Sequence, residues 1–152
     1  MKLAEALNAR ADAQKRLQQI RQRVQLSARH QEGETPAEDP NELLAEAERV
    51  AAGLERIIAA INRTNVSVEL EPGMSMTDAL ARRDVLGIRR AMLTEAAQVA
   101  SVRQDRYSKS EVKFVSALDV QAIHREADAI AKEYRELDAK IQAKNWEAEL
   151  AE

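Results

Sequence analysis

The chain has 152 residues but no cysteine, only four glycines, and aromatic residues at just 3% of its length. Without cysteine it can form neither disulfides nor thiolate nucleophiles nor cysteine-ligated metal sites. The scarcity of aromatic residues argues against a β-sandwich, whose strands are rich in aromatic and β-branched side chains. A glycine-rich phosphate loop and the motifs G-x-G-x-x-G, H-E-x-x-H and G-x-S-x-G are also missing. We therefore expect a protein that is not an enzyme and that holds no cofactor.

The two histidines do not have the sequence surroundings of a metal site. A di-iron helical bundle needs Glu-x-x-His on two helices, but the residue three before His124 is Gln121. His30 stands at the end of the first helical segment, where the helix dipole favours a positive charge. We predict that neither histidine binds a metal.

Long apolar segments are absent as well. No run of apolar residues approaches the roughly 18 that are needed to span a bilayer. The first residues also lack the apolar core of a secretory signal. We expect a soluble, cytoplasmic protein.

Charge is distributed unevenly along the first 61 residues, although the net charge of the chain is only −3. Residues 1–30 carry seven Lys and Arg against two acidic residues, and residues 31–61 carry eight acidic residues against two Arg. Because opposite charges attract, this pattern predicts a basic first helix beside an acidic second helix, in the same chain or in a second copy. The basic segment has no aromatic residue to stack on bases, so we expect no nucleic-acid partner.

Apolar residues recur at steps of three and four in four segments, residues 2–29, 40–62, 78–102 and 119–146. At 1.5 Å per residue each predicted helix is roughly 35–42 Å long. Between the second and third helices, Val66, Val68 and Leu70 alternate with polar residues, and a Pro-Gly pair follows. Residues 64–77 are therefore predicted to form a short β-hairpin or an extended excursion. The fold class is all-α, a single domain over residues 1–152 built as a bundle of about four long antiparallel helices.

The third helix has apolar residues on more than one face. Its main stripe contains Ala81, Val85, Ile88, Met92 and Val99, whereas Leu80, Leu86, Leu93, Ala97 and Ala100 lie off that line. A helix that is apolar on two faces is contacted from two sides. We predict that this helix is the most buried of the four.

The second and fourth helices have coiled-coil registers over nearly three heptads. Long helices with few aromatic residues bury modest area within one chain, so we expect a homo-oligomer. The predicted oligomer seam consists of Leu54, Ile57, Ile61, Ile130, Tyr134, Leu137, Ile141 and Trp146.

The densest polar cluster lies between the third and fourth helices. It combines two guanidinium groups, a phenol and an amine, which suit a phosphate-like anion, at Arg103, Arg106, Tyr107 and Lys109. The alternative is that Asp105 pairs with the nearby arginines and fixes a loop.

Four blocks of the sequence together resemble an uncharacterised family of small bacterial helical proteins, some of them labelled septicolysin. The resemblance covers Met1 to about Trp146, and its blocks are Met1–Leu7 with Arg10–Leu17, Ile61–Asn65 with Thr77–Asp84, Arg103–Ser108 with Glu111–Val115, and Tyr134–Asp138 with Ile141–Trp146. It implies a helical and oligomeric protein and brings no catalytic residues, while the septicolysin label implies action on membranes.

The leading hypothesis is therefore a non-enzymatic oligomeric scaffold or interaction protein. The first alternative is an anion-binding or small-molecule-binding protein, or a weak enzyme, that uses the Arg103–Lys109 segment. A membrane-active protein is the second, because the first helix is basic and partly amphipathic.

Overall fold

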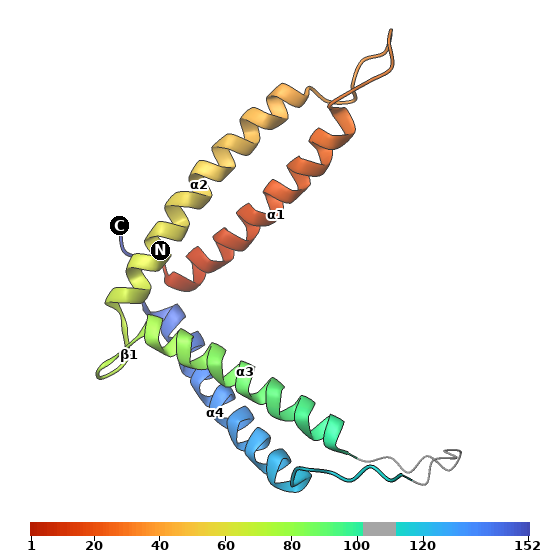
Figure 1. The fold of residues 1–152 in the computed structure, drawn as a ribbon. Coiled ribbons are helices and arrows are strands. Elements are labelled where there is room, and N and C mark those ends of the chain that lie inside the picture. The colour runs from red at the N-terminus through yellow and green to blue at the C-terminus, as the bar shows by residue number, and fades with distance from the viewer. Residues whose placement is uncertain (102–111) are drawn as a thin grey trace. The chain divides into compact units, whose positions relative to one another are not determined.

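The computed structural model describes residues 1–101 and 112–152. In this part of the chain lie four long helices, α1 (Leu3–Ser27), α2 (Pro40–Ser67), α3 (Met76–Ala100) and α4 (Val120–Glu147) (Figure 1). Two short strands, β1 (Glu69–Glu71) and β2 (Met74–Ser75), form a two-stranded antiparallel sheet between α2 and α3. The predicted all-α class, with four long helices and a short β excursion, is confirmed.

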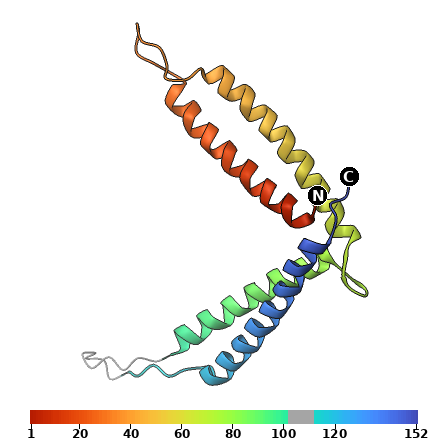
Figure 2. The same cartoon turned by 180° about the vertical axis from the view of Figure 1, so that it is seen from behind.

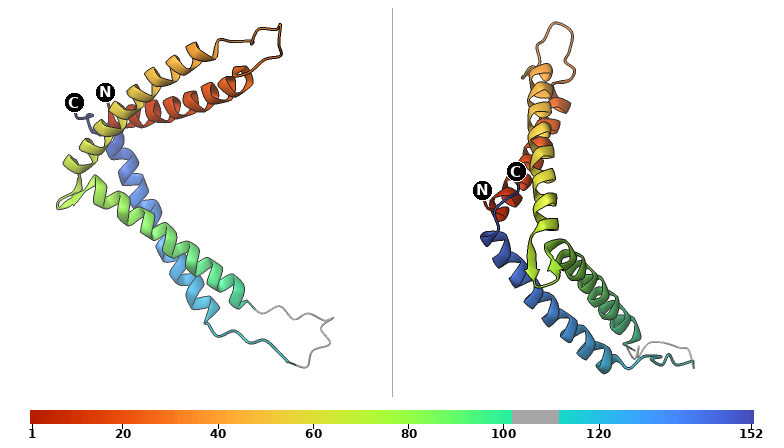
Figure 3. Two further views of the ribbon diagram at one scale, coloured as in Figure 1. Left: turned by 45° about the horizontal axis from the view of Figure 1, so that its top comes forward. Right: turned by 90° about the vertical axis from the view of Figure 1, so that its left-hand side faces the viewer.

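The helices divide between two compact units. Unit 1 comprises Met1–Glu69 and Ala143–Glu152, and unit 2 comprises Leu70–Gln142. In unit 1, α1 and α2 lie side by side and run in opposite directions (Figures 1 and 2). In unit 2, α3 and α4 form a second antiparallel pair (Figure 3). The single domain over residues 1–152 stays a prediction.

The core of unit 1 lies where the beginning of α1 meets the end of α2. Leu3, Ala6, Ile61 and Ala148 form a buried cluster there. Further along the pair, Ile20 and Leu43 are buried, so the apolar contact extends towards the loop that joins α1 to α2.

Ion pairs join α1 to the acidic residues that follow it. Arg16 Nε donates to Glu46 at 2.9 Å, and Arg23 Nε donates to Glu38 at 2.9 Å. The hydrogen bond from Arg23 lowers the pKa of Glu38. The predicted pairing of a basic first helix with an acidic second helix is confirmed within the chain.

The core of unit 2 lies between α3 and α4. Its buried members are Met76, Ala79, Leu86, Ile130, Leu137 and Ile141. Leu70 and Met74 of the hairpin pack against this cluster and cover one end of it. Two arginines of α3 also reach carboxylates of α4, Arg82 pairing with Glu133 at 2.5 Å and Arg83 with Asp138 at 3.1 Å.

The excursion between α2 and α3 is shorter than the 64–77 predicted, because both flanking helices extend into it. The Val68 N–H donates to the Thr64 carbonyl at 2.9 Å, so α2 continues through Val66 despite the alternating pattern. At the other side, Ser75 and Asp78 form a capping box that begins α3 at Met76. The turn between the strands contains Gly73 at φ 79°, a left-handed conformation that glycine adopts without strain.

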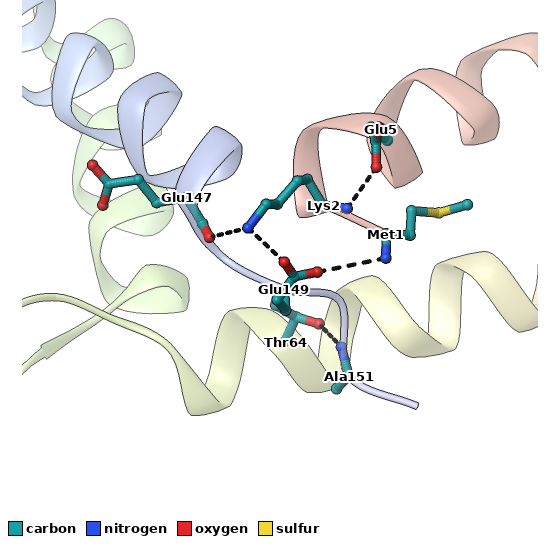
Figure 4. Close-up of polar contacts among 7 residues, drawn as sticks. All are labelled: Met1, Lys2, Glu5, Thr64, Glu147, Glu149 and Ala151. Carbon is teal, nitrogen blue, oxygen red and sulfur yellow. Dashed lines mark hydrogen bonds and ion pairs between the residues drawn. The ribbon is translucent and has the colours of Figure 1, made fainter.

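The first residues of the chain and those after α4 form a small antiparallel contact, which we call the terminal clasp (Met1–Leu3 and Ala148–Ala151; Figure 4). Its backbone bonds run from Leu3 N to Ala148 O and from Leu150 N to Met1 O, each 2.9 Å long. The ammonium of Lys2 donates to the Glu149 carboxylate at 2.5 Å and to the Glu147 backbone carbonyl at 3.0 Å. The Ala151 N–H donates to the buried Thr64 hydroxyl, so the clasp is attached to α2.

The two apolar positions Ile20 and Leu26 of α1 give a matched test of packing in unit 1. Ile20 is 0% exposed and Leu26 is 83% exposed. We expect Ile20→Ala to lower the free energy of unfolding by about 2–5 kcal/mol, because it leaves a cavity. We expect Leu26→Ala to change it by less than about 0.5 kcal/mol. Urea unfolding followed by circular dichroism measures both, and equal effects would contradict the assigned packing.

The terminal clasp should respond to acid. The hydrogen bond from Lys2 lowers the pKa of Glu149 from its ordinary value of 4.5. A lowered folded-state pKa means that the stabilisation is present above pH 4.5 and is lost as the pH falls through the folded-state value. The melting temperature of Glu149→Gln should therefore lie below that of the unaltered protein near pH 6, and the difference should shrink in acid.

Glu147→Gln is the matched control for this acid response. Its backbone carbonyl, and not its carboxylate, accepts the Lys2 hydrogen bond (Figure 4). This variant should keep the pH profile of the unaltered protein. A profile that changes in Glu147→Gln and not in Glu149→Gln would refute the assignment.

Candidate interaction surface

One face of α3 carries a row of apolar side chains that α4 does not cover. The row, which we call the α3 stripe, consists of Ala81, Val85, Ile88, Met92, Ala96 and Val99. Its four large members are between 54% and 86% exposed. On most exposed helical faces, large apolar residues occur singly. The α3 stripe is therefore an unusual surface in the described part of the chain.

The prediction that α3 is the most buried helix is wrong. Leu86, which lies off the main stripe, is buried in the core shared with α4, and the half-buried Leu80 and Leu93 pack against that core. Among the residues of unit 2 that the structure describes, α4 is the one long helix beside α3, and one neighbour covers only one face of a helix. The second apolar face is left in contact with solvent.

The apolar surface continues from the end of α3 onto the segment that precedes α4. Phe114 and Val115 are 86% and 84% exposed, and Leu118 is also exposed. Together with Ala96 and Val99 these residues line an open hollow of about 520 Å³. The exposed apolar surface is therefore larger at the C-terminal end of α3 than at its beginning.

Charged residues border the α3 stripe differently on its two edges. At 3.6 residues per turn, Asp84 and Glu95 lie along one edge, and Arg82 and Arg89 lie along the other. Asp84 is exposed and pairs with Arg83 at 3.0 Å. The surface thus has an acidic edge, an apolar centre and a basic edge.

Arg83 takes part in the contact between α3 and α4 and not in either edge of the α3 stripe. Burial favours the neutral form of its guanidinium, but the hydrogen bonds to Asp84 and Asp138 outweigh that effect and raise its pKa. The ion pair of Arg83 with Asp138, at 3.1 Å, therefore joins α3 to α4.

The predicted oligomer seam falls mainly inside the chain. Ile61, Ile130, Leu137 and Ile141 are buried in the two cores, and Ile57 and Tyr134 pack against them. Leu54 is half-buried in an open groove of about 410 Å³ with Ala51 and Ile58, and Trp146 is 59% exposed. Most positions that the coiled-coil register singled out are thus interior positions of the chain. That these eight residues form a seam between two chains stays a prediction.

The predicted anion-binding residues Arg103, Arg106, Tyr107 and Lys109 lie outside the described residues. Within residues 1–101 and 112–152, no group of three or more His, Cys, Asp or Glu side chains is arranged to hold a metal ion. In the same part of the chain, no helix has both the length and the apolar character to cross a membrane.

The fold and surface define an all-α protein of paired long helices with one exposed apolar helical face. Residues 10–150 match the model of a family of unknown function, DUF6847, and the chain belongs to this family. It is also similar to the crystal structure of a functionally unknown conserved protein from Corynebacterium diphtheriae. The identity is 44% and the TM-score 0.93, and the match covers 99% of this chain and 98% of the other. No curated protein matches.

These comparisons confirm that the chain comes from an uncharacterised family and do not support the septicolysin label. The family and its solved relative carry no assigned activity.

Glutamate substitutions on α3 should separate its two faces. Leu86 is 3% exposed and Ile88 is 67% exposed. We expect Leu86→Glu to lose most of the cooperative unfolding of unit 2, because it places a charge in the core. Ile88→Glu should keep the helical content of the unaltered protein. Circular dichroism and thermal unfolding measure both, and loss of helix in Ile88→Glu would show that the α3 stripe is interior.

Proposed function

We propose that the protein is a non-enzymatic interaction protein that assembles with a second copy of itself through the α3 stripe. The observation that carries the proposal is the exposure of Val85, Ile88, Met92 and Val99 in one line. Contiguous apolar surface of this kind, bordered by charge, is typical of protein–protein contact sites.

The size of the surface supports pairing of two copies. Burying one large apolar side chain removes on the order of 100 Å² from water. Six such side chains from each copy, four on α3 together with Phe114 and Val115, would bury roughly 1,200 Å² in total, the lower end of the range for specific interfaces. The α3 stripe alone would give a smaller and weaker contact.

Nothing in the described part of the chain favours the two alternatives from the sequence. Anion binding at Arg103–Lys109 stays a prediction, because those residues lie outside the described ranges. Membrane action has no helical span to support it among the described residues. The cytoplasmic location likewise stays a prediction.

Light scattering coupled to size exclusion tests the proposed assembly. We expect the unaltered protein at micromolar concentration to have at least twice the chain mass of 17.0 kDa. Combining Ile88→Glu with Met92→Glu should reduce the mass to that of one chain, because two charges in the centre of the interface would be desolvated.

Leu26→Glu is the control, since it adds a charge to an exposed apolar position of α1 in unit 1. It should leave the measured mass unchanged. An unaltered protein that is a monomer at micromolar concentration, or a double variant that still assembles, would contradict the proposed function.

A further inference from the structure

The α3 stripe runs almost straight along its helix. Its members are spaced by four, three, four, four and three residues, which repeats every eleven residues. An eleven-residue repeat corresponds to about 3.67 residues per turn, close to the 3.6 of a straight α-helix. A second straight helix can therefore contact the stripe over its whole length of roughly 27 Å, calculated at 1.5 Å per residue.

We infer that two copies pair with their α3 helices parallel, about a two-fold axis that runs along the helices. This inference rests on the proposed function and specifies its partner and orientation. Two observations carry it, the opposite charges of the two stripe edges and the unequal apolar ends of the surface.

The charges distinguish the two orientations. In a parallel pair, the acidic edge of one helix meets the basic edge of the other. A residue on the acidic edge then faces the residue of the second copy whose sequence number is five higher. Asp84 and Arg89 have this spacing and lie on opposite edges. Each Asp84 would then face Arg89 of the second copy, and the two-fold axis makes the contact twice.

An antiparallel pair would bring like charges together. With Ile88 opposite Met92 of the second copy, the two acidic edges meet and the two basic edges meet. Asp84 would then lie near Glu95 of the second copy, and Arg89 would lie near its own counterpart. Like charges opposed across an interface disfavour that arrangement.

The unequal exposed apolar surface at the two ends of α3 also favours the parallel orientation. Phe114, Val115 and Val99 stand at the C-terminal end of α3. A parallel pair places these residues of both copies at one end, where they can cover each other. An antiparallel pair would instead place them beside Thr77, Asp78 and Ala81 at the beginning of α3, where little apolar surface is available.

Because the chain has no cysteine, single introduced cysteines report the orientation directly. Val85→Cys and Ala96→Cys are eleven residues apart, about 16 Å along the helix. A disulfide needs Cα atoms within about 7 Å, so each variant can cross-link only to the position opposite it. In the parallel pair each variant alone forms a covalent dimer on mild oxidation.

The antiparallel pair predicts the opposite cross-linking result. Neither variant alone would cross-link, and an equimolar mixture would give a Val85→Cys to Ala96→Cys dimer. Leu26→Cys, on α1, measures the background of chance collisions. Self-cross-linking well above this background in both variants supports the inference.

The remaining outcomes separate failure of the orientation from failure of the function. Cross-linking only in the mixture overturns the parallel pairing and leaves assembly through the stripe intact. A dimer by light scattering without cross-linking overturns both the orientation and the surface. A monomer overturns the proposed function itself.

Exchanging the edge charges is a second test, because a purely apolar contact would keep the same dimerisation affinity after the exchange. Asp84→Arg or Arg89→Asp alone should weaken dimerisation about tenfold at low salt, because each creates two like-charge contacts. The double exchange restores opposite charges and should recover most of the affinity. An additive loss in the double variant would overturn the pairing of Asp84 with Arg89.

Discussion

The contact of α3 with a single helix is the constraint on which the surface of unit 2 depends. Leu86 and Ala79 on one face of α3 form a buried core with Ile130 and Leu137 of α4. Among the described residues of unit 2, no second helix or strand covers Val85, Ile88 and Met92, which are exposed. Exposed apolar surface is unfavourable in water in proportion to its area. In the proposed dimer, burial of these three exposed side chains would supply the driving force for association.

Charged side chains restrict how each helix pair can be arranged. The pairs Arg83–Asp138 and Lys140–Glu71 each join elements of unit 2 that are far apart in sequence. Exposed ion pairs contribute little to stability, typically about 0–1 kcal/mol each. Their effect is on register, because sliding one helix by a turn along the other would separate opposite charges at several points. The apolar core supplies most of the stability, and the ion pairs select one alignment.

Local chemistry made much of the fold predictable from sequence. Asp39 accepts a hydrogen bond from Asn41 N at 2.8 Å and begins α2, and the Pro-Gly pair forms the turn of the hairpin. These features depend on neighbouring residues, so the sequence contains them directly. The first and last residues of the excursion between α2 and α3 could not be predicted from the sequence in the same way. The alternation through Val66 and Val68 matches a strand, whereas the hydrogen bonds around Thr64 continue the helix.

The candidate surface was less accessible to sequence reasoning. Both apolar stripes of α3 have helical spacing, and periodicity does not say which stripe α4 covers. Ile130 and Ile141 of α4 likewise have a coiled-coil register, yet they are buried within their own chain. A heptad pattern indicates that a helix packs against another helix, but it does not say whether that helix belongs to the same chain or to a second copy. Only the three-dimensional pairing of α3 with α4 shows which apolar positions of α3 remain exposed.

A surface of this kind also has to avoid open-ended assembly. A self-association that is not closed by symmetry continues into filaments, whereas a two-fold contact uses the same patch on both copies and stops at two. The α3 stripe is self-complementary in the parallel arrangement, because its acidic and basic edges exchange places across the two-fold axis. In the proposed dimer, a reversed neighbour would oppose like charges at Asp84 and Arg89, and a shifted one would leave Asp84 without its partner Arg89. Under the proposed parallel pairing, the edge charges would therefore favour a closed dimer over continued growth.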